Sequence, residues 1–222
     1  MTKTQTRIEI IEDIKPRVVY SAYIPAPFDE AKEALEADNY RIISLEDNAR
    51  LRIQEGKDKD VSIHGNFVRE GSIYVPQKGS FMTKASPVMK NAQKATDAHR
   101  NGDHYFLSND QVEEALTDAI EMSQKSIPTN RFADDEITRY AFGETAEAYG
   151  RFLKEAGIKE MPVWPLNPND KAIATQMWFG DLDDGSDLDG DDSYLDCNCR
   201  VRGVRQSGAE GTQKNLESKV SQ

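Results

Sequence analysis

The chain has no uninterrupted apolar run of about 18 residues, so the sequence predicts no membrane-spanning helix. Residues 1–17 lack the apolar centre of a secretory signal, and we expect no such signal there. No nucleophile elbow, glycine-rich phosphate loop or His-Glu zinc signature occurs. Carboxylates are abundant, but a general acid also needs a pocket that perturbs it. The sequence therefore predicts no enzyme, and it leaves localisation open between the cytoplasm, a cell surface and a virion.

Cysteine and histidine are scarce, with two and three copies in 222 residues. Cys197 and Cys199 are one residue apart, which does not make an ordinary disulfide framework, so we expect a fold without disulfide staples. Thiolate metal sites need about four ligands, usually in separated pairs, and His64, His99 and His104 supply no such spacing. The two cysteines are therefore interpreted as small residues on one face of a strand.

Basic residues are outnumbered, with 28 Lys and Arg against 39 Asp and Glu, and the net charge is -11. This balance argues against nucleic acid as a partner, because affinity for phosphate needs clustered Lys and Arg. A composition of 37% hydrophobic and 30% charged residues is typical of a globular protein. The length allows one large domain or two small ones and is sufficient to bury a core.

The apolar patterning predicts an α+β fold with short, mostly antiparallel strands, two or three helices and long loops. Helices are expected at 28–38 and 144–156, at 111–122 after an N-cap cluster around Ser108, and as a further candidate at 87–99. A hairpin turn is expected at Glu70-Gly71. Strands are expected at 7–11, 17–22, 41–45, 61–68, 72–75, 81–84, 104–107, 136–142, 174–182 and 193–204, and 161–164 is an apolar stretch bounded by prolines.

Residues 179–199 form the most unusual segment, with the sequence FGDLDDGSDLDGDDSYLDCNC. This segment, called the acidic segment below, holds eight of the chain's 21 aspartates and none of its 18 glutamates. Lys, Gln, Met and Trp are also absent from it, and each of its residues can be encoded by a codon that ends in a pyrimidine. A solvated acidic face normally mixes Asp with Glu, so something other than charge has selected these residues.

One interpretation of the acidic segment is a calcium-binding loop. An EF-hand loop places oxygen ligands at positions 1, 3, 5, 7, 9 and 12 around a glycine at position 6. With Gly190 at position 6, the aspartates Asp187, Asp189 and Asp196 occupy positions 3, 5 and 12. Position 1 is then Gly185, so the first ligand is missing and an aspartate replaces the bidentate glutamate. An exposed polar loop is the plainer interpretation, with calcium as the alternative cofactor.

A second interpretation separates buried from exposed positions. Eight aspartates cannot be buried without partners, so most of them must face water. Leu182, Leu188 and Leu195 are spaced through the stretch and are expected to point inward. Along strands of period two, Trp178 shares a face with Leu182, and Val201 shares one with Leu195. The sequence thus predicts a rigid frame that holds small polar side chains toward solvent.

The pattern from Trp178 to Arg205, W…DDGS…Y…RVRGVR, resembles the C-terminal end of C-type-lectin-fold domains. More specifically, it is similar to the variable proteins of diversity-generating retroelements, and best to the archaeal (AvpA-like) type. In that family a reverse transcriptase copies a template with errors at adenines, and Asn codons AAY become NNY. Such codons never encode Glu, Lys, Gln, Met or Trp, the five types absent from the acidic segment.

The resemblance implies a single C-type-lectin-like domain over 1–205, a variable region at about 174–205 and a polar flexible tail at 206–222. It implies a non-catalytic protein that binds a protein or surface ligand. The acidity favours a basic partner, and the scarcity of aromatic anchors favours weak binding to any other. A less favoured alternative is an enzyme of the formylglycine-generating type, which would need a buried, reactive cysteine.

The resemblance also assigns roles to individual residues. The exchangeable contacts are expected to be Phe179, Gly180, Asp181, Gly185, Asp187, Asp189, Asp192, Ser193, Tyr194, Asp196, Cys197, Asn198 and Cys199. The scaffold is expected to be Trp178, Leu182, Leu188, Leu195, Arg200, Val201 and Arg202.

Overall fold

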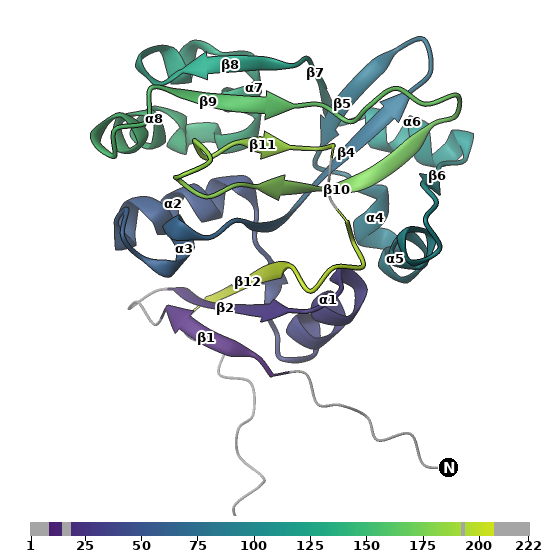
Figure 1. Ribbon diagram of the computed structural model, residues 1–222, viewed down its shortest axis with the longest axis horizontal. Helices are drawn as coiled ribbons and strands as arrows, with labels where there is room; N and C mark the ends of the chain where they lie inside the picture. The colour runs from purple at the N-terminus through teal and green to yellow at the C-terminus, as the bar shows by residue number, and fades with distance from the viewer. Residues whose placement is uncertain (1–8, 15–18, 192–193, 207–222) are drawn as a thin grey trace, which may run out of the picture.

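A mixed, mostly antiparallel sheet organises the molecule in a computed structural model, which describes residues 9–14, 19–191 and 194–206 (Figure 1). Its main path runs in the order β1-β2-β12-β4-β10-β11-β9-β8, with β3, β5, β6 and β7 attached to it. The strands are β1 Ile11–Ile14, β2 Val19–Pro25, β3 Arg41–Ile42, β4 Asn66–Val75, β5 Gly79–Thr83, β6 Tyr105–Phe106, β7 Ala119–Met122, β8 Lys125–Pro128, β9 Glu160–Trp164, β10 Ile173–Phe179, β11 Leu188–Asp189 and β12 Arg200–Gln206. In the part of the chain described, β11 with β9 and β12 with β4 are the parallel pairs.

Helices surround the sheet, and there are more of them than the two or three expected. The α-helices are α1 Phe28–Ala37, α2 Leu45–Glu55, α3 Asp60–Ile63, α4 Pro87–Lys90, α5 Ala92–Arg100, α6 Asn109–Leu116, α7 Glu136–Phe142 and α8 Ala146–Glu155, and two 3₁₀ turns span Thr129–Asp134 and Gly143–Thr145. Figure 1 shows α4, α5 and α6 grouped around β6, with α2, α3 and α8 at the opposite side of the view. None of the helices in the described ranges is long and apolar enough to cross a membrane.

The sheet separates two hydrophobic cores, because successive residues of a strand point to opposite faces. On β4, the neighbours Phe67 and Val68 belong to different cores. On β10, Phe179 lies in the core that α2, α7 and α8 cover, whereas Trp178 packs against the core that contains α1. A strand buried on both faces is expected at the centre of such a sheet, and β10 accordingly has no exposed residue.

Local capping decided several helices that the sequence analysis placed wrongly. Residues 136–142 form helix α7 and not a strand, because Asp135 caps it by accepting a hydrogen bond from the Ile137 backbone N–H (2.8 Å). Helix α2 was missed altogether, although Ser44 caps it by accepting from the Asp47 backbone N–H (3.1 Å). The expected helix at 111–122 ends at Leu116, since the following residues pair with β5 as strand β7. The expected N-cap at Ser108 is confirmed, and the structure adds a capping box with Gln111.

The predicted hairpin turn at Glu70-Gly71 is also wrong, because both residues lie inside the continuous strand β4. The turn comes instead between β4 and β5, at residues 76–78, where Gln77 has a φ of 67°. Gly71 has a different use, since a Cβ atom there would lie 2.6 Å from the Ser86 Oγ. The glycine therefore permits a close approach of two segments.

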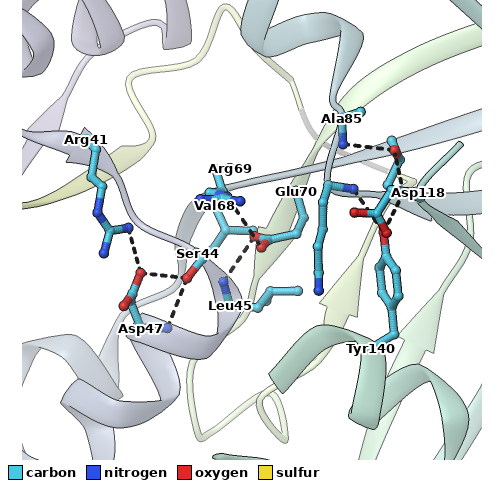
Figure 2. A network of polar contacts seen from close by, with 12 residues as sticks. Arg41, Ser44, Leu45, Asp47, Val68, Arg69, Glu70, Ala85, Asp118 and Tyr140 are labelled. Carbon is cyan, nitrogen blue, oxygen red and sulfur yellow. Dashed lines mark hydrogen bonds and ion pairs between the residues drawn. The ribbon is translucent and has the colours of Figure 1, made fainter. Parts of the chain in front are cut away.

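A buried carboxyl links β4 to the start of α2. Glu70 is 2% exposed and accepts a hydrogen bond from the backbone N–H of Leu45 (3.0 Å), and its neighbour Arg69 lies at 4.0 Å, as Figure 2 shows. Burial raises the pKa of Glu70 to about 7, and the hydrogen bond and basic neighbours only partly offset this. Figure 2 also shows the hydrogen bond that the Tyr140 hydroxyl donates to the backbone carbonyl of Asp118 (2.7 Å). The Glu70 contact thus fixes β4 to the start of α2, and the Tyr140 contact fixes α7 to the turn before β7.

Candidate functional site

The acidic segment divides into three parts with different local structure. A tight loop at 180–187 joins the antiparallel strands β10 and β11, which pair at Phe179 and Leu188. The short strand β11 follows and lies beside β9. A turn-rich stretch then leads to β12, which begins only at Arg200. Of the expected strand over 193–204, residues 194–199 are therefore not a strand and residue 193 lies outside the described residues, so Leu195 and Cys197 do not alternate along a strand.

The loop between β10 and β11 is closed by its own hydrogen bonds. The Ser186 N–H donates to the Asp181 carbonyl (2.7 Å), and the Gly185 N–H donates to the Leu182 carbonyl (3.1 Å). Gly185 and Ser186 both have positive φ, of 75° and 62°, which glycine adopts freely and few other residues do. The tip of the loop therefore presents Asp183 and Asp184 to solvent, two positions that the sequence analysis did not select although the D-D-G pattern is a turn signal.

A buried arginine on α2 forms hydrogen bonds with the loop between β10 and β11. The guanidinium of Arg52, 0% exposed, donates hydrogen bonds to the Gly180 carbonyl (2.8 Å) and the Ser186 Oγ (2.9 Å). It also donates to the Tyr149 hydroxyl (3.1 Å) and the Val61 carbonyl (2.9 Å). These acceptors come from both ends of the loop, from α8 and from α3. Arg52 thus fixes the loop backbone without using an aspartate side chain from its tip.

Phe179, which the sequence analysis expected among the exchangeable contacts, lies in the core and not at the surface. It is 0% exposed, and its ring centroid lies 5.7 Å from that of Phe142 and 6.0 Å from that of Tyr149. The Arg52 guanidinium sits 4.1 Å from its ring centroid, within the range of a cation–π contact. The first residue of the acidic segment therefore belongs to the frame.

Gly180 is also constrained, because a Cβ atom there would lie 1.7 Å from the Asp187 Oδ1. The Asp187 carboxyl folds over this glycine, and the Gly180 N–H donates to the Asp187 carbonyl (3.0 Å). Burial, together with the nearby charges of Asp189, Asp184 and Asp181, raises the pKa of Asp187 to about 7. At neutral pH this position therefore carries a carboxyl group that is partly protonated.

Replacing Asp187 by asparagine is expected to stabilise the protein at pH 8 and not at pH 4. The folded-state pKa lies above the ordinary pKa of 3.8 for an aspartate, so the stability linked to this group is full below pH 3.8 and is lost as pH rises through about 7. With solvent screening, the gain at pH 8 is expected to be about 1–2 kcal/mol. Urea denaturation at the two pH values measures it.

The matched control is Asp184→Asn at the exposed loop tip, which is expected to change stability by less than about 0.5 kcal/mol at either pH. Glu70 titrates in the same range, but it does so in parent and variant alike and cancels in their difference. An Asp187→Asn variant whose stability follows the parent at every pH would show that this carboxyl is not perturbed.

The turn-rich part before β12 is anchored by a leucine and closed by a disulfide. Leu195 is 0% exposed, and its carbonyl accepts a hydrogen bond from the Phe28 N–H at the start of α1 (2.8 Å). Cys197 and Cys199 are bonded to each other, with their Cα atoms 5.1 Å apart. The prediction of a fold without disulfides is therefore wrong, because a turn brings the two residues together. Asn198, between them, is exposed.

The first residues of β12 are tied to α3 and β2 through their arginines. Arg200 and Arg202 both donate to the Asp60 Oδ1, at 2.6 and 2.8 Å. Burial alone would raise the pKa of Asp60, but the hydrogen bond and charge of Arg200, together with the Arg202 charge, hold it below its usual value. Both guanidinium groups also lie over the Tyr23 ring, 4.2 and 5.3 Å from its centroid. This cluster fixes the end of the acidic segment.

The predicted scaffold and contact positions therefore differ in burial, although no finding tests their roles in binding. Four of the scaffold side chains, Leu182, Leu188, Leu195 and Val201, are at most 7% exposed, Arg202 is 1% exposed, and Trp178 and Arg200 are partly buried. Of the predicted contacts, Tyr194 and Asn198 are exposed, Asp181, Gly185, Asp187, Asp189, Asp196, Cys197 and Cys199 are partly buried, and Phe179 and Gly180 are buried. Asp192 and Ser193 lie outside the described residues.

The arrangement offers oxygen acceptors, an amide and one phenol, and this chemistry suits recognition of a ligand. Among the residues that the structure describes, no three His, Cys, Asp or Glu side chains are grouped so as to hold a metal ion. Both cysteines of the chain are in the disulfide, so the free thiol that the formylglycine-generating chemistry needs is not present in this structure.

The architecture is that of the C-type lectin fold, as the sequence analysis predicted. A solved structure whose description is "Accommodation of massive sequence variation in Nanoarchaeota by the C-type lectin fold" matches 90% of this chain and 98% of its own, with a TM-score of 0.61 and 16% sequence identity. At that identity the likeness concerns the fold. No family model matches the chain, and no curated protein matches it in sequence.

Proposed function

We propose that the chain is a non-catalytic ligand-binding protein whose variable region, at about 174–205, is diversified by adenine-specific retroelement mutagenesis, as in the archaeal, AvpA-like variable proteins. The observation that carries the proposal is the separation of roles within one short segment. Its backbone is held by buried groups such as Arg52 and Leu195, whereas residues such as Asp183, Tyr194 and Asn198 project into solvent. Exposed side chains can change with little effect on stability.

The residue alphabet of the acidic segment supports the same proposal. Five residue types that pyrimidine-ending codons cannot encode are absent from 179–199. The solved structure with a similar fold, which is described as accommodating massive sequence variation, also supports the proposal. Because the exposed aspartates give the segment a strong negative potential, the ligand of this variant is expected to be a basic protein or surface.

The coding sequence tests the proposal directly. At Gly180, Gly185 and Ser193, whose residue types can also be encoded by purine-ending codons, we expect pyrimidines in the third place. We also expect a near-copy of the segment, with Asn codons at its exposed positions, beside a reverse transcriptase gene. Buried positions such as Leu188 are expected to be identical between the two copies, because their side chains fill the core.

Asp, Asn, Tyr, Cys and Phe codons always end in a pyrimidine, so purine third positions at Gly180, Gly185 or Ser193 are the outcome that would contradict diversification. A calcium titration followed by thermal unfolding distinguishes the alternative of a calcium-stabilised module. Binding at micromolar calcium that raises the melting temperature would favour that alternative.

A further inference from the structure

A cavity of about 310 Å³ opens beside the last part of the acidic segment. Its walls come from the loop that follows α5, from the stretch after β9, from β10 and from the acidic segment itself. Leu166 and Ile173, which are 6% and 2% exposed, contribute apolar walls. Tyr194, the most exposed aromatic side chain of the described residues at 64%, contributes a ring. The volume is at the small end for ligand sites, which range from about 300 to 1,000 Å³.

The charged groups that line the cavity are acidic. Asp103 and Asp191 both line it, and no lysine or arginine is among the described lining residues. The Asp191 carboxylate is held in place by Asn167, whose backbone N–H and side-chain amide donate to its two oxygens at 3.2 and 2.7 Å. The Asp191 N–H in turn donates to the Asp189 Oδ1 (2.7 Å). A carboxylate fixed in this way loses little entropy when it binds a ligand.

Two of the chain's three histidines, His99 and His104, also line the cavity. Burial lowers the pKa of His99 below its ordinary value of 6.5, although the charge of Asp196 acts in the opposite direction. The neighbouring His104 lowers it further. The cavity therefore combines two carboxylates, flat imidazole and phenol rings and apolar walls.

We propose that this cavity is a subsite for the guanidinium group of an arginine side chain on a protein partner. A guanidinium is cationic and planar, it pairs with carboxylates through several N–H groups, and it stacks on aromatic faces. The cavity has room for one side chain and not for an extended chain of sugars. This inference rests on the proposed ligand-binding function and specifies the chemistry of the partner.

Nα-acetyl-arginine amide is the probe, and Nα-acetyl-citrulline amide, of nearly the same shape but uncharged, is its control. Each is titrated into the full chain at pH 7.5 and 150 mM salt, and the histidine ring signals are followed by NMR. The His99 and His104 signals are expected to shift with a dissociation constant on the order of 1 mM for the arginine probe. His64 does not line the cavity, so its signals are expected to stay in place.

Charge-removing variants locate the binding. Asp191→Asn is expected to weaken the arginine probe at least fivefold, and Asp103→Asn provides an independent variant in the loop that follows α5. Asp184→Asn removes the same charge from the nearby exposed loop and is expected to change affinity less than twofold. Thermal unfolding of each variant establishes that it is folded before its affinity is compared.

Three results would overturn the arginine subsite: equal binding of the citrulline probe, an equal shift of the His64 signals, or an equal loss of affinity in Asp184→Asn. Failure of this inference differs from failure of the proposed function. A coding sequence that contradicts diversification would leave a measured arginine site in place. A coding sequence that supports diversification, with no probe binding, would remove only the subsite.

Discussion

Replacing Arg52 by alanine is expected to lower the free energy of unfolding by about 3–5 kcal/mol. The change leaves the buried carbonyls of Gly180 and Val61 without the donors that now satisfy them, at 2.8 and 2.9 Å. It also opens a void beneath Phe179, whose ring the guanidinium now covers. Urea denaturation measures the loss, and amide hydrogen exchange at Gly180 and Ser186 is expected to become faster because the loop loses its anchor.

Arg50→Ala is the matched control, because Arg50 lies on the same helix with its side chain 55% exposed and paired with Glu46. Its loss is expected to cost less than about 1 kcal/mol and to leave exchange in the loop unchanged. Arg52→Lys keeps the charge but not the planar array of donors, so we expect an intermediate loss. If Arg52→Ala and Arg50→Ala proved equally stable, the loop would not depend on the buried arginine.

Phe179→Ala is expected to cost about 3–5 kcal/mol, whereas Tyr194→Ala in the same segment is expected to cost less than about 0.5 kcal/mol. Phe179 is 0% exposed among Phe142, Tyr149 and Arg52, and Tyr194 is 64% exposed. The comparison therefore measures how strictly frame and surface are separated between two aromatic residues 15 positions apart. Urea midpoints of the two variants give the difference.

Phe179→Leu serves as the second variant in case the alanine variant does not fold, and its cost is expected to stay below about 1.5 kcal/mol. Similar losses for Phe179→Ala and Tyr194→Ala would contradict the division of the acidic segment into a buried frame and a replaceable surface.

The inward leucines could be predicted from the sequence, because isolated apolar residues in a strongly polar stretch have few other stable positions. Leu188 and Leu195 are indeed 0% exposed. The fold class was predicted from a residue pattern near the C-terminus and is confirmed by the structural match. In both cases a short sequence pattern agrees with the environment that these residues have in the folded protein.

The other sequence-based predictions failed for two reasons. Either two local sequence signals compete, or the feature depends on contacts between residues far apart in the sequence. Residues 136–142 carry branched and aromatic side chains that suit a strand, and the Asp135 cap and the burial of Ile137, Ala141 and Phe142 decide for a helix. Nothing local marks Arg52 as the anchor of a loop 128 residues away. The cavity lined by His99 and Asp191 could not be predicted from the sequence either, because its walls come together only in the folded chain.

The place of β12 in the sheet affects how the chain folds during synthesis. This last strand lies between β2 and β4, and its residues from Arg200 to Gln206 pair along the whole of β2. Until β12 has been translated, one side of β2 remains an unpaired edge, and such edges are prone to aggregation. We therefore expect the sheet to close only after translation of the acidic segment, so that correct folding of this segment is a condition for completing the sheet.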